Sequence, residues 1–160
     1  MADARMMPDL ADELVEAIEA GFNTDEYCAA RGAGASHQEC LEVIQHPYTL
    51  EEEPYALAIF ICYREARQFG ATHAECMEVL DRRTENFGYR EARRAGATHA
   101  ECMEALDNEA DLEDYAWARE QGATHGECME ALDRQVDLWD YAGARQAGAS
   151  HAKSMKAGGK

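Results

Sequence analysis

The feature that most limits how this chain can fold is a unit that recurs every 26 residues. One copy, residues 89–114, reads YREARRAGATHAECMEALDNEADLED. The histidine of its GATH core recurs at this spacing at His73, His99, His125 and His151, and a displaced earlier copy has His37. Such self-similarity predicts an array in which each copy adopts the same local structure and covers the apolar face of its neighbour.

One copy reads as two short helices. The first carries Tyr89 and Ala92 at helical spacing and ends at Gly96, since glycine accepts the left-handed conformation that follows a helix end. The second begins at Thr98, and Glu101 three residues later completes a capping box. An apolar stripe follows at helical spacing: His99, Cys102, Met103 and Leu106.

Helices this short are marginal in isolation, because nucleation outweighs a few hydrogen bonds. We therefore predict an all-α fold, an α-solenoid of short helical hairpins with a 26-residue repeat, in one domain over residues 1–160. Its predicted parts are an N-terminal cap helix (1–21), a first hairpin (22–45), an insertion with an extended helix (46–62), regular repeats (63–140) and a truncated basic C-terminal cap (141–160).

The N-terminal cap is interpreted as a degenerate second helix. ELVEAIEAG at residues 13–21 aligns with ECMEALDNE at residues 101–109, which puts Leu14 in the cysteine position and Ala11 in the histidine position. At the other end of the chain, Ser154 takes the cysteine position and lysines replace both glutamates of the motif.

The insertion breaks the period, since His37 and His73 are 36 residues apart. We expect a loop at residues 46–48, a capping box formed by Thr49 and Glu52, and an extended helix from about residue 50 to residue 69. The segment YALAIFI at residues 55–61 is apolar on every face, so its helix is either wholly buried or presents an interaction surface.

The charge balance bears on partners. Thirty-two acidic residues against fifteen basic ones give a net charge of −17, which argues against direct binding to nucleic acid or to an anionic membrane and favours a protein partner with a basic surface. No signal peptide is visible, and the apolar run at residues 55–63 is too short to span a bilayer. The sequence predicts a cytoplasmic location.

The positions of the cysteines in the repeat bear on disulfides and on metal binding. Four of six cysteines, Cys40, Cys76, Cys102 and Cys128, occupy one position in successive copies, and stacked helices ~8–10 Å apart hold such positions too far apart for disulfides. We therefore expect reduced thiols.

The His-x-x-Cys pairs could supply ligands for zinc or copper: His73 and Cys76, His99 and Cys102, His125 and Cys128. Positions that also accept leucine and serine behave as packing positions, so we predict no metal and no cofactor.

One arginine per copy, at Arg31, Arg67, Arg93, Arg119 and Arg145, is expected to pair with glutamates of an adjacent second helix and form a ladder. The repeated tyrosines are expected in the core. Glu101, Glu104 and Asp107 lie along one helix face, and neighbouring copies repeat the pattern. Such a regular acidic surface is usually a solvated face, yet it can also imitate a nucleic-acid backbone.

Enzymatic motifs are missing: the sequence has no Gly-rich phosphate loop, no nucleophile elbow and no HExxH. We predict a non-catalytic interaction, adaptor or assembly module that acts through its acidic surface and the 46–60 insertion. The expected contact residues are Tyr48, Tyr55, Ile59, Phe60, Glu78, Glu104 and Glu130. The alternatives are an acidic, nucleic-acid-mimicking inhibitor of a DNA- or RNA-binding protein and a metal-binding repeat. The acidic first helix and the basic tail also suggest head-to-tail self-association.

Overall fold

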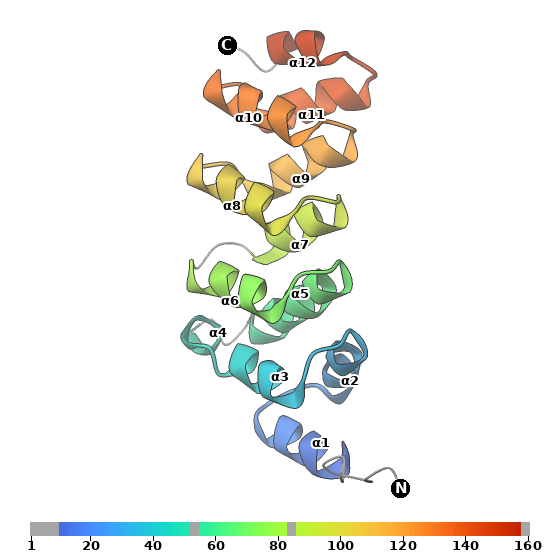
Figure 1. The fold of residues 1–160 in the computed structure, drawn as a ribbon, viewed down its shortest axis with the longest axis vertical. Helices are drawn as coiled ribbons and strands as arrows, with labels where there is room; N and C mark the ends of the chain where they lie inside the picture. The colour runs from blue at the N-terminus through green and yellow to red at the C-terminus, as the bar shows by residue number, and fades with distance from the viewer. Residues whose placement is uncertain (1–9, 52–54, 83–85, 158–160) are drawn as a thin grey trace, which may run out of the picture. The chain divides into compact units, whose positions relative to one another are not determined.

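The computed structural model describes residues 10–51, 55–82 and 86–157, and in these ranges it contains α-helices and no strands (Figure 1). This confirms the predicted all-α fold. In chain order the helices are α1 (Leu10–Glu19), α2 (Thr24–Gly32), α3 (His37–Ile44), α4 (Pro47–Glu51), α5 (Ala56–Gln68), α6 (His73–Asp81), α7 (Asn86–Arg94), α8 (His99–Asp107), α9 (Leu112–Glu120), α10 (His125–Asp133), α11 (Leu138–Gln146) and α12 (His151–Ala157).

The chain divides into two compact units. The N-terminal unit takes in residues 1–68 and 72–83, and the C-terminal unit takes in residues 69–71 and 84–160. The single domain expected from the sequence stays a prediction.

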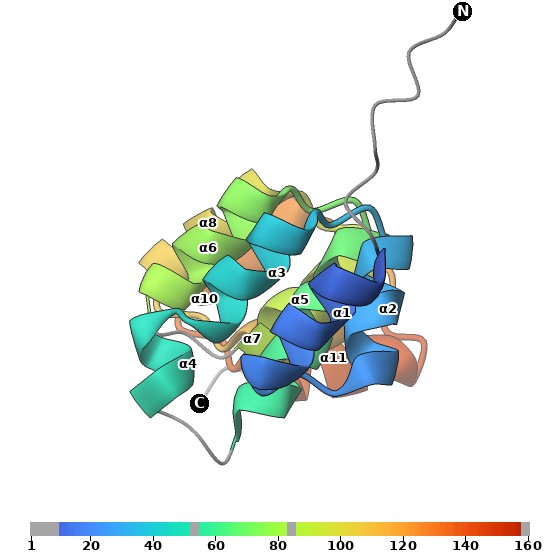
Figure 2. The same ribbon diagram turned by 90° about the horizontal axis from the view of Figure 1, so that it is seen from below.

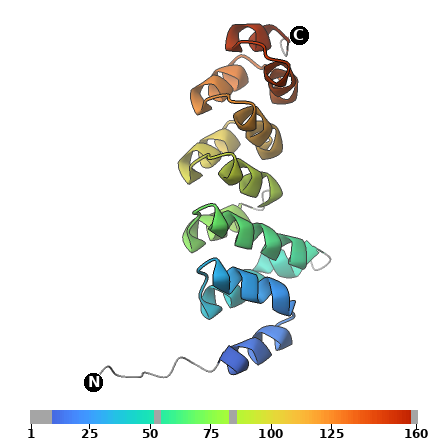
Figure 3. The same ribbon diagram turned by 90° about the vertical axis from the view of Figure 1, so that its right-hand side faces the viewer.

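Within each unit the helices pack as stacked hairpins, as an α-solenoid requires. In the C-terminal unit the first helices α7, α9 and α11 pack side by side, and each second helix, α8 or α10, packs against the first helix that follows it in the chain (Figures 1 and 3). In the N-terminal unit α2 packs against α5 in the same way, and α3 packs against α5. Each hairpin therefore covers the apolar side of its neighbour within the unit.

The starts of the second helices α3, α6, α8 and α10 are fixed by capping boxes, as the sequence predicts. Ser36, Thr72, Thr98 and Thr124 are the N-cap residues of α3, α6, α8 and α10, and each exchanges hydrogen bonds with the glutamate three residues later. The first helices α9 and α11 begin at aspartate N-caps, Asp111 and Asp137. Gly96, which follows α7, has φ of 85°, the left-handed conformation expected of it.

The core consists of tyrosines, alanines and the repeated cysteines. Tyr27, Tyr115 and Tyr141 are fully buried, and Tyr63 and Tyr89 nearly so. Cys40, Cys76, Cys102 and Cys128 are buried in the second helices, and no disulfide joins the six cysteines, all of which lie in the described ranges. In α12, Ser154 is buried at the equivalent position, so these are packing positions, as expected.

The insertion differs from its prediction. Residues 47–51 form the short helix α4, with Pro47 at the first helical position, where its missing N–H costs nothing (Figure 2). Thr49 lies inside α4 and does not cap a helix. Glu52, its expected capping partner, falls outside the described residues. The extended helix begins later than expected, at Ala56 and not near residue 50: it is α5, which has 13 residues where α7, α9 and α11 have 9 each.

Candidate interaction groove

The junctions between hairpins are built from paired carboxylates. The second helices α3, α8 and α10 each present two glutamates three residues apart to the next hairpin, where one contacts an arginine and the other a histidine. In the N-terminal unit Glu39 of α3 lies 3.2 Å from Arg67 Nη1, and Glu42 lies 2.9 Å from His73 Nε2. The expected arginine ladder is confirmed in this unit and recurs in the other as Arg119–Glu101 at 3.3 Å and Arg145–Glu127 at 3.9 Å.

The first helix of the chain joins this pattern. Glu13 of α1 lies 3.1 Å from Arg31, and Glu16 lies 3.1 Å from His37. These are the contacts that the glutamates of a regular second helix make. The interpretation of α1 as a degenerate second helix is therefore confirmed.

The repeated histidines are held from the other side by the core tyrosines. In the hairpin of α9 and α10, Arg119 Nη1 donates to the Tyr115 hydroxyl over 2.8 Å, and that hydroxyl lies 3.0 Å from His125 Nδ1. The same pair joins Tyr27 with His37 (2.8 Å) and Tyr141 with His151 (2.9 Å). Burial raises the pKa of both Tyr27 and Tyr141 to about 12, and it also raises that of Tyr115. The hydroxyl thus keeps its proton, and it accepts from Arg119 while it is hydrogen-bonded to His125 Nδ1.

These contacts bear on the His-x-x-Cys pairs. The Nδ1 atoms of His73, His99 and His125 each lie within 3.1 Å of a tyrosine hydroxyl. Burial raises the pKa of the Cys128 thiol to about 12 and that of the Cys40 thiol to about 11, which disfavours the thiolate that a metal requires. Across residues 10–51, 55–82 and 86–157, no group of three or more His, Cys, Asp or Glu side chains is placed to hold a metal ion.

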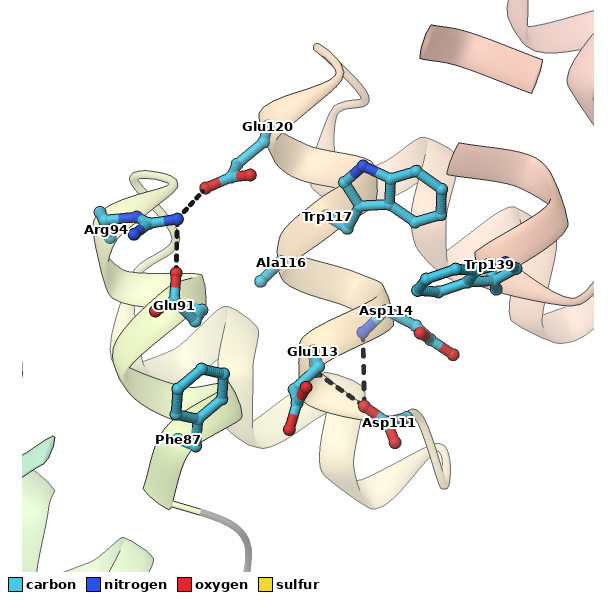
Figure 4. Close-up of a pocket in the computed structure, with 10 residues that line it drawn as sticks. All are labelled: Phe87, Glu91, Arg94, Asp111, Glu113, Asp114, Ala116, Trp117, Glu120 and Trp139. Carbon is cyan, nitrogen blue, oxygen red and sulfur yellow. Dashed lines mark hydrogen bonds and ion pairs between the residues drawn. The ribbon is translucent and has the colours of Figure 1, made fainter. Parts of the chain in front are cut away.

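A groove of about 520 Å³ lies across the first helices of the C-terminal unit (Figure 4). Trp117 of α9 and Trp139 of α11 form its aromatic wall, and Phe87 of α7 lies on the opposite side (Figure 4). The two indole rings lie 4.4 Å apart, centroid to centroid, at an interplanar angle of 50°. Trp139 is 60% exposed and Phe87 is 46% exposed, so large apolar surface faces solvent here. The remaining lining residues are Glu91, Arg94, Asp111, Glu113, Asp114, Ala116 and Glu120.

Five carboxylates and one guanidinium line this groove, and the guanidinium is already engaged. Arg94 lies 2.6 Å from Glu91 and 2.7 Å from Glu120, and the three side chains form one edge of the groove (Figure 4). Asp111 accepts from the backbone amides of residues 113 and 114 as the N-cap of α9. The groove therefore keeps a net negative charge beside its aromatic wall.

Asp114 is the carboxylate that its surroundings favour least. Partial burial raises its pKa above the ordinary value of 3.8, and the negative charges of Asp111 and Asp137 raise it further. Within the described part of the chain, no cationic side chain contacts the Asp114 carboxylate, which lies beside Trp139 in Figure 4. An anionic side chain next to two other carboxylates and an indole favours a cation from outside the chain.

The groove occurs where the repeat departs from its own pattern. Phe87, Glu113 and Trp139 occupy one position of the unit in α7, α9 and α11, and each is a different kind of residue. At a second position α7 has Glu91, α9 has Trp117 and α11 has Gly143. A Cβ atom at residue 143 would lie 3.7 Å from the edge of the Trp117 ring, an ordinary van der Waals distance, so residue 143 lies directly beside the indole.

The residues expected from the sequence to contact a partner differ in how far the structure exposes them. Ile59 and Phe60 are buried in α5, where Phe60 packs edge-on against Phe22 with ring centroids 4.7 Å apart. Their assignment to a partner surface is therefore corrected: both are core residues. Tyr55 is exposed and Tyr48 is half-buried. The insertion also exposes Leu50 and Leu57, so it keeps an apolar surface made of other residues.

The predicted acidic surface is partly used inside the molecule. Glu104 lies 3.3 Å from His125 Nε2, without the angle of a hydrogen bond. Glu130 lies 3.3 Å from His151 Nε2 and 2.8 Å from Arg134. Glu78 is exposed and lies 3.4 Å from Arg82. These glutamates serve the hairpin junctions and helix surface pairs as well as facing solvent.

No protein-family model, no curated protein and no solved structure matches this chain. Among the helices of the described ranges, none has the length and apolar character needed to cross a bilayer.

Proposed function

We propose that this protein is a non-catalytic interaction module that binds another protein through the groove of its C-terminal unit. The observation that carries this proposal is the groove itself, where the exposed Trp139 and Phe87 and the half-buried Trp117 are accompanied by five carboxylates. Tryptophan is among the residues most enriched at protein–protein hot spots, because it combines a large apolar area with a small loss of conformational entropy.

The exposed apolar surface of the insertion supports the same function in the N-terminal unit. Leu50, Tyr55 and Leu57 are about half exposed or more, although the neighbouring core of that unit is well packed. Large exposed apolar side chains that gather in one segment mark interaction sites more often than isolated ones do. This surface would extend the contact with the same partner or serve a second one.

The proposal is tested by affinity capture from an extract of the source organism. The bait is the full chain, and bound proteins are quantified by mass spectrometry for the wild type, for Trp139→Ala and for Tyr55→Ala. We expect at least one partner to be bound by the wild type and lost with Trp139→Ala, whose side chain contributes little to the core because it is exposed. Identical sets of captured proteins for the wild type and Trp139→Ala would overturn the assignment to the groove.

A further inference from the structure

We infer that the groove of the C-terminal unit binds an arginine side chain from a basic peptide segment of the partner, with the guanidinium on the Trp139 indole and against the Asp114 carboxylate. This inference rests on the proposed function and names the chemistry of the partner. It follows from the aromatic side chains of the groove, from its net charge, and from the ion pairs that already hold its lining arginine, Arg94.

The aromatic wall suits a planar cation. A guanidinium stacks on the face of an indole, where the ring's negative face attracts the positive charge, and tryptophan is the best of the aromatic residues for this contact. The exposed Trp139 ring leans against Trp117, so it is held in place by a neighbouring ring without being covered by it. The chain itself shows the arrangement at the far edge of the groove, where the Arg90 guanidinium lies 4.0 Å from the centre of the Phe87 ring.

The charge of the groove selects a cation over a neutral apolar group. Arg94 is bound on two sides by Glu91 and Glu120, so it neutralises one edge only. At the other edge Asp114 lies near Asp111 and Asp137 and has no cationic partner among the residues that the structure describes. An incoming guanidinium would meet a carboxylate that is partly desolvated already, where a charge-assisted hydrogen bond is strong.

The competing occupant is a neutral apolar segment, for which the aromatic wall alone would be enough. The Asp114 carboxylate, beside Asp111 and Asp137, makes that occupant unfavourable, because a neutral segment would desolvate it further without supplying a compensating charge. A basic segment supplies that charge. The chain's net charge of −17 adds long-range attraction for such a segment.

The test uses intrinsic fluorescence, because the two tryptophans in the full sequence are the two that line the groove. The probe is a tri-arginine peptide with blocked termini, and its control is the tri-citrulline peptide, which has nearly the same shape and no charge. We expect a saturable change in emission with tri-arginine and none with tri-citrulline. Tri-lysine should bind more weakly, since an ammonium cannot stack as a plane.

Three variants of the full chain separate the site from general attraction to an acidic protein. Asp114→Asn and Asp133→Asn change the net charge equally, but Asp133 is exposed on α10 and does not line the groove. We expect Asp114→Asn and Trp139→Ala each to weaken tri-arginine binding about tenfold or more, and Asp133→Asn to change it less than twofold. The remaining Trp117 reports binding in Trp139→Ala, and circular dichroism confirms the fold of each variant.

Equal binding of tri-arginine to all three variants and the wild type would overturn the inference, and so would equal binding of tri-citrulline. If a captured partner is lost with Trp139→Ala while tri-arginine does not bind, the arginine inference fails and the proposed function stands. If tri-arginine binds as expected while the captured proteins are the same for the wild type and Trp139→Ala, the proposed function fails at the groove.

Discussion

At the scale of single residues, the fold depends on a short relay of side chains that recurs at the hairpin junctions. An arginine donates to a core tyrosine, the tyrosine hydroxyl is hydrogen-bonded to a histidine, and the arginine and histidine reach two glutamates of the preceding second helix. Each exposed ion pair of this kind contributes little, ~0–1 kcal/mol. The tyrosine hydroxyl is partly buried and joins two partners, so it is the member whose loss costs most.

Tyr115→Phe tests that ranking. It removes the hydroxyl between Arg119 and His125 and keeps the ring that fills the core. We expect the free energy of unfolding, measured with urea, to fall by about 1–3 kcal/mol, since the partners lose a hydrogen bond in a desolvated site. Tyr55→Phe is the matched control at an exposed tyrosine and should change the stability by less than about 0.5 kcal/mol. Equal stability of Tyr115→Phe and the wild type would contradict the relay.

The cysteines give a second test at this scale. Cys28 is exposed, whereas the other five are buried, and burial raises the pKa of Cys40 to about 11 and of Cys128 to about 12. Because the thiolate is the reactive form, brief alkylation of the native protein at about pH 8 should modify Cys28 alone. Peptide mass spectrometry reads the result. Rapid modification of Cys102 or Cys128 in the folded protein would show that the cysteine positions are not core.

At the scale of helices, close packing of the first helices in the C-terminal unit depends on a glycine. A Cβ atom at residue 88 would lie 2.7 Å from the Cβ of Leu112, closer than such atoms approach, and 3.0 Å from the backbone nitrogen of Glu113, a tight contact. We expect Gly88→Ala to destabilise the protein by about 1–3 kcal/mol, because α7 and α9 must separate. Differential scanning calorimetry would show a lower melting temperature.

Gly126→Ala is the matched control. Residue 126 lies in α10 with open space around it, and the equivalent residues in α6 and α8 are alanines, Ala74 and Ala100. This substitution should stabilise by up to about 1 kcal/mol, because alanine lowers the entropy of the unfolded chain. If Gly88→Ala left the melting temperature unchanged or raised it as Gly126→Ala does, the close approach of α7 and α9 would be wrong.

The capping boxes predict a dependence on acid. The hydrogen bond from the Thr124 backbone amide holds the pKa of Glu127 below its ordinary value of 4.5, and Arg145 lowers it further. A carboxyl whose pKa is depressed in the folded state stabilises it above the unfolded pKa, and this contribution is lost as the pH falls through the folded pKa. Glu127→Gln should therefore lower the stability near about pH 7, and the difference from the wild type should shrink below about pH 4. A difference that is constant with pH would exclude the carboxylate's role.

The elements that sequence reasoning predicts well are those whose signals are local. Thr98 with Glu101 and the glycine at position 96 define helix ends within a few residues, so a single copy is enough to place them. The arginine–glutamate ladder follows from the regular stacking of copies, and α1 could be assigned because Glu13 and Glu16 keep their places in the unit. The same reasoning fails at Phe60, since its burial depends on Phe22, which comes from a distant part of the chain.

The repeat pattern does not predict the groove, for a different reason. Reading the chain as a repeat directs attention to what the copies share, whereas the groove is formed by Phe87, Trp117 and Trp139, where they differ. An alignment of the first helices alone would have shown aromatic residues at two variable positions of that surface. It would not have shown that Trp117 and Trp139 meet, because they occupy different positions of the unit and come together through the packing of α9 on α11.

At the scale of the whole molecule, the contacts that recur in each copy stabilise the stack of hairpins, whereas the surface that varies between copies forms the proposed binding groove. The hairpin junctions use many of the glutamates for stacking, among them Glu104 and Glu130, so the acidic character of the chain does not by itself define a binding site. The groove adds to that charge an exposed aromatic wall and an aspartate without a cationic partner in the described ranges. Head-to-tail self-association and a cytoplasmic location stay predictions from the sequence.

The most direct test of the groove as the binding site is nuclear magnetic resonance of the two tryptophan indole N–H groups. The sequence contains two tryptophans, so the spectrum of ¹⁵N-labelled protein has two indole signals, and Trp139→Ala assigns them. On titration with a purified partner identified by capture, we predict that both signals shift and saturate together with binding. A partner that binds while both indole signals stay unchanged would contradict the account.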